Sequence, residues 1–119
     1  MHELSIAESI VAVAQRNAAG RRVARVVVSV GHLRQVVPSS LEFAFELVTE
    51  GTALDGAELV LDEIPADGLC RSCGLVSRLD GFPLNCGLCG SADVEIVAGE
   101  ELQVEWLDVE EDEEVAHGR

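Results

Sequence analysis

The chain has 119 residues, 48% of them apolar, which is enough for one domain with its own hydrophobic core. Its 22 acidic residues outnumber its 8 basic ones, all arginine, and the net charge is −14. This balance argues against nucleic-acid binding, which needs a basic surface to neutralise phosphates. No apolar run reaches the ~20 residues of a membrane span. Because the first residues also lack the basic segment of a signal peptide, we expect a cytoplasmic protein and no membrane partner.

The first predicted element is a helix over residues 5–19. Ser5 and Glu8 match the capping-box pattern of a helix start, and Gly20 suits the position after a helix end. Its buried side is predicted from apolar residues at helical spacing: Ile6, Ile10, Val13 and Ala14. A helix that begins at Ser5 leaves Met1-His2-Glu3 as a short free end.

The rest of the body alternates strands with one further helix. Residues 23–30 and 57–64 have the β-branched, alternating pattern of strands, and a last strand is predicted from Leu102. Between them, Ser39 and Glu42 form a second capping box after Pro38. The buried stripe of this second helix is predicted to be Leu41, Ala44, Phe45 and Val48.

These elements predict an α+β fold, a small β-sheet flanked by two helices, with an inserted four-cysteine zinc ribbon. The expected α/β domain comprises residues 1–65 plus 99–109, and residues 66–98 form the inserted module. Residues 110–119 continue an acidic run and are expected to be a disordered tail.

All four cysteines lie in the inserted stretch, as two CxxC pairs: Cys70, Cys73, Cys86 and Cys89. Two such turns can direct four thiolates at one centre, which is the ligand set of a closed structural Zn²⁺ site. Gly74 and Gly90 follow the pairs and can adopt the positive φ that each turn needs. The alternatives are two disulfides, which suit small secreted chains, or a redox dithiol, which usually has a single CxxC in a βαβ unit.

The inserted module has few apolar residues of its own. Leu79, Phe82, Pro83 and Leu84 could form a small core, but not one that folds independently. A bound metal is therefore expected to stabilise this module.

His2 is placed for a second kind of metal site. A terminal amine, the amide nitrogen of His2 and its imidazole can close two chelate rings around Ni²⁺ or Cu²⁺, which favour planar nitrogen donors. The Glu3 amide or carboxylate could complete the set. His32 is predicted to be a surface residue and His117 to lie in the tail. No nucleophile–base set or phosphate loop is evident, so we do not expect an enzyme.

Taken together, the chain resembles the HypA/HybF family of nickel metallochaperones. The matching stretches are Met1-His2-Glu3-Leu4-Ser5-Ile6, Leu41-Glu42-Phe43-Ala44-Phe45-Glu46, Gly51-Thr52-Ala53-Leu54-Asp55-Gly56-Ala57, both CxxC-Gly turns and Gly99-Glu100-Glu101-Leu102. The resemblance implies nickel bound through His2 as transient cargo, and structural zinc on Cys70, Cys73, Cys86 and Cys89. Gly87 departs from the family, which usually has proline there, and is expected to loosen that turn.

The resemblance also implies partners and a pathway. The expected partners are a nickel-handling maturation GTPase and the large subunit of a [NiFe]-hydrogenase, with urease as another recipient and a weak homodimer left open. A rival interpretation is a zinc-ribbon interaction module that binds zinc but delivers no nickel. A second rival is a dithiol redox protein, in which the thiols cycle and bind no zinc.

Overall fold

The structure, a computed structural model, describes residues 2–110. It divides into two compact units. The first comprises Met1–Val28, Val36–Asp62 and Gln103–Arg119, and the second comprises Ser29–Gln35 and Glu63–Leu102. The first unit contains both helices, and the second contains all four cysteines.

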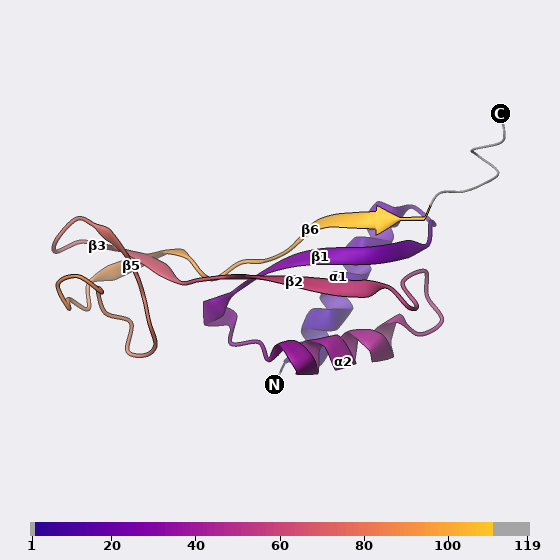
Figure 1. The fold of residues 1–119 in the computed structure, drawn as a ribbon, viewed down its shortest axis with the longest axis horizontal. Coiled ribbons are helices and arrows are strands. Elements are labelled where there is room, and N and C mark those ends of the chain that lie inside the picture. The colour runs from indigo at the N-terminus through magenta and orange to yellow at the C-terminus, as the bar shows by residue number, and fades with distance from the viewer. Residues whose placement is uncertain (1, 111–119) are drawn as a thin grey trace, which may run out of the picture. The chain divides into compact units, whose positions relative to one another are not determined.

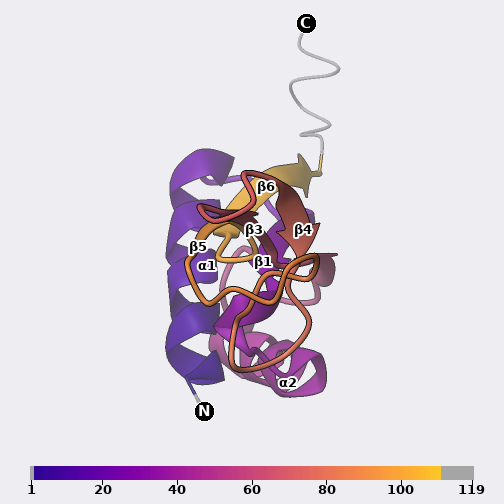
Figure 2. The same ribbon diagram turned by 90° about the vertical axis from the view of Figure 1, so that its left-hand side faces the viewer.

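In the first unit, two helices accompany a three-stranded sheet. The helices are α1 (Glu3–Ala18) and α2 (Pro38–Thr49), and they pack against each other. Strand order in the sheet is β2-β1-β6, so β1 is central (Figure 1). The strands are β1 (Val23–Gly31), β2 (Glu58–Ile64) and β6 (Leu102–Val109), and each also has residues in the second unit. Helix α1 runs along one face of this sheet in both views (Figures 1 and 2).

The core of the first unit follows the helical periodicity closely. Helix α1 buries six apolar residues: Ile6, Ala7, Ile10, Val11, Ala14 and Ala18. The prediction for Val13 was wrong, because this residue is only half-buried and lines a surface pocket. In α2, Thr49 is buried in place of the predicted Val48, and its hydroxyl donates to the Phe45 carbonyl at 2.8 Å.

Both helices begin earlier than predicted. Helix α1 starts at Glu3 and not at Ser5, because His2 is the N-cap and its carbonyl accepts the Ile6 N–H at 3.0 Å. The Ser5 hydroxyl donates to the same carbonyl at 3.0 Å and does not cap the helix. Helix α2 starts at Pro38, where a residue without an N–H is tolerated because a first-turn N–H has no intrahelical acceptor.

The second unit has its own three-stranded antiparallel sheet. Its strands are β3 (Asp67–Cys70), β4 (Val76–Arg78) and β5 (Val94–Ala98), in the order β4-β3-β5. A short 3-10 helix (His32–Arg34) also belongs to this unit. Two chain segments meet here without side chains between them, since a Cβ on Gly31 would overlap the Gly99 carbonyl. Hydrogen bonds from Gly31 N to Glu101 O (2.7 Å) and from Leu33 N to Gly99 O (2.8 Å) hold these segments together.

The predicted core of the cysteine module is only partly formed. Leu79 is 2% exposed and packs on Gly68, where an added Cβ would lie 2.9 Å from the Leu79 Cδ1. Phe82, in contrast, is 63% exposed, and Pro83 is also exposed. The side chains of this unit therefore bury little apolar surface.

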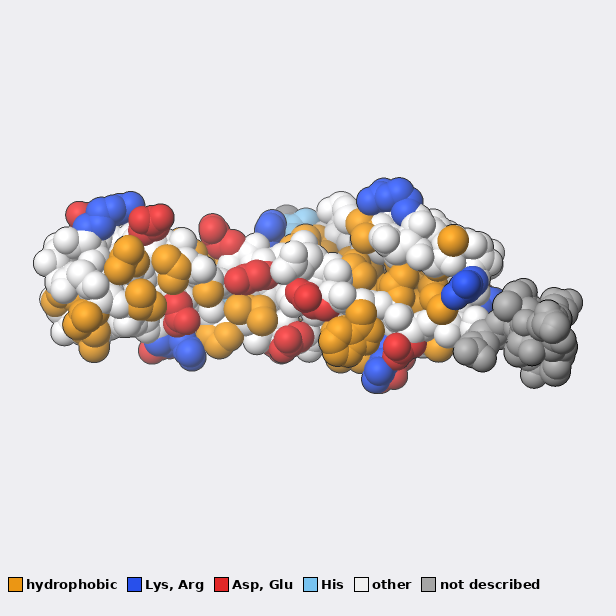
Figure 3. All heavy atoms as spheres, turned by 90° about the horizontal axis from the view of Figure 1, so that it is seen from above, with side chains coloured by type: hydrophobic (Ala, Val, Ile, Leu, Met, Phe, Trp, Pro, Cys, Tyr) orange, Lys and Arg blue, Asp and Glu red, His pale blue; other side chains and the backbone are white. Residues whose placement is uncertain are grey.

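Acidic and arginine side chains alternate over the surface. The face drawn in Figure 3 carries red and blue patches side by side and shows no continuous basic stripe. Several of these charges pair across strands, including Arg25 with Asp108 and Arg78 with Asp67. Within the described residues, none of the helices combines the length and apolar character that a bilayer crossing requires.

The predicted acidic tail is only partly within the described residues. Glu110 is included, and its N–H donates to the Arg22 carbonyl at 2.8 Å. Residues 111–119, with His117, lie outside the described residues.

The ion pair between Arg25 and Asp108 is expected to contribute little to stability. The closest oxygen of Asp108 is 2.7 Å from the guanidinium of Arg25, but the two side chains are 42% and 47% exposed. Water screens such pairs, so Asp108→Asn should lower the free energy of unfolding by less than about 1 kcal/mol. Urea denaturation of this variant, with Glu42→Gln as an exposed-acid control, measures the difference. A loss of several kcal/mol at Asp108 alone would contradict this expectation.

Candidate metal centre

The two CxxC turns have the same backbone structure. In the first, the Gly74 N–H donates to the Cys70 carbonyl at 2.8 Å, and in the second the Gly90 N–H donates to the Cys86 carbonyl at 3.0 Å. Gly74 and Gly90 have φ values of +78° and +82°, the left-handed region that a Cβ disfavours. The glycines predicted from sequence to permit these turns therefore do so.

The turns bring four sulfur atoms into one cluster. Among the described residues, Cys70, Cys73, Cys86 and Cys89 are the group positioned to hold a metal ion, with all four Sγ atoms within 4.8 Å of one another. The Sγ–Sγ distances are 3.6 Å for Cys70–Cys89 and 3.8 Å for Cys73–Cys86. Four sulfurs held tetrahedrally at ~2.3 Å from zinc lie ~3.8 Å apart, whereas a disulfide bond is ~2.05 Å long. The spacing therefore fits zinc coordination and not a disulfide.

Backbone N–H groups support the thiolate form that a metal ligand needs. The Cys73 N–H lies 3.4 Å from the Cys70 Sγ and lowers the pKa of that thiol. The N–H groups of Cys89 and Leu88 donate to the Cys86 Sγ at 3.4 and 3.3 Å and lower its pKa to about 6. Donors to sulfur stabilise the negative charge, so these two cysteines are prepared for metal binding in the folded chain.

Polar contacts hold the first turn to residues that follow the second. The Arg71 N–H donates to the Asp93 carbonyl at 2.9 Å, and its guanidinium contacts the Asp93 carboxylate at 2.8 Å. The hydroxyls of Ser72 and Ser91 are 3.0 Å apart. These contacts fix the two turns relative to each other and so fix the four-sulfur geometry.

Gly87 makes a hydrogen bond in its turn that the sequence did not indicate. Its N–H donates to the Ser77 hydroxyl at 3.0 Å, a bond that proline cannot make. The same hydroxyl lies 3.8 Å from the Cys86 Sγ. A side chain at position 87 would also be crowded, because a Cβ there would be 2.9 Å from the Arg78 carbonyl oxygen. Ser77 was missed by sequence reasoning, because no local pattern indicates its contact with Gly87, ten residues further along the chain.

The amino-terminal residues form a different environment. His2 is exposed and is the N-cap of α1. Glu3 was predicted to be part of a free end, but it is only 7% exposed, and its Oε2 accepts the Val37 N–H at 3.1 Å. Val37 was also missed, because no local pattern indicates a contact between residues 34 positions apart.

His32 belongs to the second unit. It is exposed, as predicted, and begins the 3-10 helix of the second unit. His2, in contrast, belongs to the first unit.

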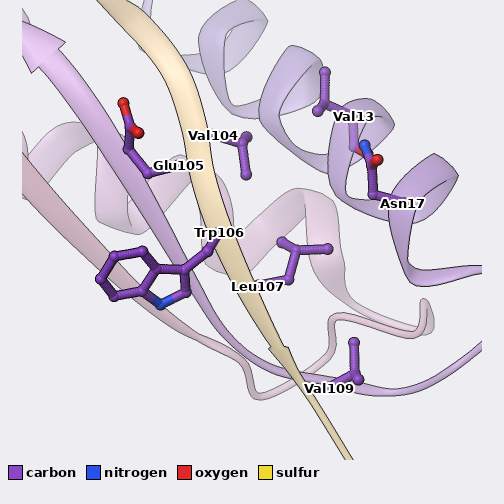
Figure 4. Close-up of a pocket in the computed structure, with 7 residues that line it drawn as sticks. All are labelled: Val13, Asn17, Val104, Glu105, Trp106, Leu107 and Val109. Carbon is purple, nitrogen blue, oxygen red and sulfur yellow. The ribbon is translucent and has the colours of Figure 1, made fainter.

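A surface pocket of about 380 Å³ lies between α1 and β6 (Figure 4). Val13 and Asn17 project into it from α1, and the remaining lining residues belong to β6: Val104, Glu105, Trp106, Leu107 and Val109. Glu105 is the only charged residue among them, so the pocket lacks the converging donors of a metal site.

Comparison with known proteins places the chain in a family. A family model described as "Hydrogenase/urease nickel incorporation, metallochaperone, hypA" matches residues 1–109. The hydrogenase maturation factor HypA of Geobacter metallireducens is 44% identical over 110 residues, covering 92% of this chain and all of the relative. The protein of the same name from Nostoc punctiforme is 40% identical over 111 residues, covering 93% of this chain and 97% of the relative.

The fold agrees with this assignment. The solution structure of the nickel metallochaperone HypA from Helicobacter pylori matches with a TM-score of 0.68 at 26% identity, over 94% of this chain and 100% of that one. The α+β prediction, with two helices, small sheets and a four-cysteine group, is thereby confirmed. The chain belongs to the HypA family of hydrogenase and urease nickel-incorporation metallochaperones.

Proposed function

We propose that this chain binds Ni²⁺ through an amino-terminal chelate, the nickel hook (residues 1–3), and delivers it during [NiFe]-hydrogenase maturation. The observation that supports this most directly is the position of His2, an exposed residue at the N-cap of α1 in a metallochaperone-family chain. The proposed donors are the terminal amine, the amide nitrogen of His2 and its imidazole. The chain would then act by moving a metal ion and not by catalysing a reaction.

The start of α1 suits the chemistry of such a chelate. An N-cap residue has no acceptor one turn earlier, so the helix leaves the His2 amide nitrogen out of its hydrogen-bond ladder. Nickel binding of this type replaces an amide proton and leaves negative charge on nitrogen. The amino end of a helix favours negative charge, so α1 lowers the free energy of the deprotonated, metal-bound form.

We also propose that Cys70, Cys73, Cys86 and Cys89 hold structural Zn²⁺, in a module that spans residues 66–98. Their sulfur spacing and their backbone N–H donors support this ligand set. Four protein ligands fill a tetrahedral site, so the cluster offers no open position through which cargo could pass. Nickel traffic is therefore assigned to the hook, in the domain formed by residues 1–65 plus 99–109.

The proposed partners follow from the family. They are a nickel-handling maturation GTPase, which supplies or receives the ion, and the large subunit of a [NiFe]-hydrogenase in the cytoplasm. The acidic surface, with a net charge of −14, would favour partners that present basic patches and would disfavour nucleic acid.

Nickel titration of the full-length chain with a native amino terminus tests the hook. His2→Ala removes the imidazole donor, and one residue added before Met1 displaces the terminal amine. Both changes should weaken nickel binding by more than the roughly 100-fold that follows loss of an outer-shell partner. Isothermal titration calorimetry gives the affinities, and the absorbance of planar nickel–nitrogen centres reports the donor set.

His32→Ala provides a matched control, because this histidine is also exposed but lies in the second unit. Its nickel affinity should equal that of the native chain. Equal binding by the native and extended chains would show that the terminal amine is not a ligand. Loss of binding in His32→Ala, with His2→Ala unaffected, would move the site to the other histidine.

A further inference from the structure

The amino end of α2 is capped by a residue from the start of α1. Val37 is the N-cap of α2, but valine has no side-chain oxygen and makes no cap of its own. The Oε2 of Glu3 accepts the Val37 N–H at 3.1 Å, which is the N–H that a glutamate in the first turn accepts in a capping box. A carboxylate at this position also meets the partial positive charge of the helix end.

Burial shows that this contact is a fixed part of the fold. Glu3 is 7% exposed, and a buried carboxylate is unfavourable unless hydrogen bonds replace its lost water. Ser39 and Ser40, the local candidates for capping, are exposed within the first turn of α2. The Glu3 side chain therefore has a structural role within the first unit, beside its neighbour His2.

The same contact restrains the His2 backbone. Two hydrogen bonds within α1 also hold this residue: the His2 carbonyl accepts the Ile6 N–H and the Ser5 hydroxyl, each at 3.0 Å. Glu3, the residue that follows His2, is held to the start of α2 by the hydrogen bond between its carboxylate and the Val37 N–H. Because two of the proposed nickel donors belong to His2, the orientation of this residue sets the chelate geometry.

We propose that Glu3 is a positioning residue for the nickel hook and not a nickel ligand. Its carboxylate caps α2 through the Val37 N–H and thereby holds His2 in the orientation that the chelate requires. This inference rests on the proposed function, and it assigns to Glu3 a role different from completing the donor set. It predicts that nickel affinity depends on the backbone N–H of Val37, the N-cap of α2, which is remote from the hook in sequence.

A pair of substitutions at position 37 tests this dependence while leaving every proposed donor intact. Val37→Pro removes the N–H, and the φ of −88° at this position is close to the range that proline adopts. Val37→Ala keeps the N–H and shortens a side chain that is 50% exposed. Calorimetric titration with nickel alone should show an affinity about 10-fold lower for Val37→Pro, as for loss of an outer-shell partner, and unchanged for Val37→Ala.

Substitutions at position 3 provide the second arm. Glu3→Gln retains an oxygen that can accept the Val37 N–H, so it should bind nickel within a few-fold of the native chain. Glu3→Ala has no acceptor and should lose about as much affinity as Val37→Pro. Native affinity in Val37→Pro, together with a large loss in Glu3→Gln, would identify the carboxylate as a ligand and overturn the proposal.

Amide hydrogen exchange of the metal-free chain keeps the test decisive if Val37→Pro fails to fold. The Val37 amide should be protected in the native chain and in Glu3→Gln, and exchange rapidly in Glu3→Ala. Rapid exchange in the native chain would also overturn the proposal. Failure of the proposed function is a separate result, because it would appear as equal nickel binding by the native chain and His2→Ala.

Discussion

Substituting Cys86 by serine is expected to unfold the second compact unit and abolish stoichiometric zinc binding. Structural zinc contributes about 10–16 kcal/mol in zinc-finger peptides, far more than the apolar burial of this unit can replace. Leu79 is one of the few apolar side chains buried there, whereas Leu75, Val76, Phe82, Leu88 and Val97 are exposed. The loss should be visible as collapse of the amide spectrum of residues 66–98 and as zinc-free protein by elemental analysis.

Leu88→Ala is the matched control, because Leu88 lies in the same turn and is 62% exposed. It keeps the N–H that donates to the Cys86 Sγ, so zinc content and the amide spectrum should stay native. The helical circular dichroism of α1 and α2 should persist in both variants. A zinc-replete, ordered Cys86→Ser chain would show that three thiolates suffice and that the four-ligand assignment is wrong.

Replacing Gly31 by alanine is expected to destabilise the fold by about 3 kcal/mol, the upper end for overpacking. The added Cβ would overlap the Gly99 carbonyl, and the overlap involves backbone that no side-chain rotation can relieve. Gly99 cannot shift freely away from Gly31, because it packs closely against Ala66: a Cβ added to Gly99 would lie 2.7 Å from the Ala66 Cα. Urea denaturation and amide exchange at Leu33, whose N–H donates to the Gly99 carbonyl, measure the effect.

Gly56→Ala separates this clash from the general cost of removing a glycine. Gly56 has φ +81°, and no heavy atom lies within 4 Å of the position its Cβ would take. Its replacement should cost only about 1–2 kcal/mol, from the left-handed backbone. Equal destabilisation by the two substitutions would mean that the segments at Gly31 and Gly99 separate easily.

The clustering of the four cysteines was predictable because its information is local. Each CxxC turn needs only its own cysteines and the following glycine, so Gly74 and Gly90 could be assigned their role from spacing alone. The same holds for the buried stripes of the helices, where the period of 3.6 residues identified Ile10 and Phe45. Val13 and Val48 were misassigned because the helical period defines a side of the helix but not the edge of the interface.

The contacts that were missed all join distant parts of the chain. Glu3 looked like a free amino-terminal residue, and its burial became evident only from its bond to Val37. Leu54 lies in the loop between α2 and β2, where no periodicity marks it as core, yet it is fully buried. Capping boxes at Ser5 and Ser39 predicted both helices but placed each start too late. Helix α1 instead starts after His2, whose carbonyl accepts the local Ile6 N–H, and α2 starts at Pro38.

The four thiols differ in their access to solvent, and this difference sets the order in which they would release a bound metal ion. In each turn the first cysteine, Cys70 or Cys86, is buried, and the second, Cys73 or Cys89, is exposed. A chelator or oxidant from solution therefore meets the second cysteine of a turn first, while the buried thiols keep their backbone donors. An ion in this cluster would leave stepwise, with Cys70 and Cys86 as the last ligands to dissociate.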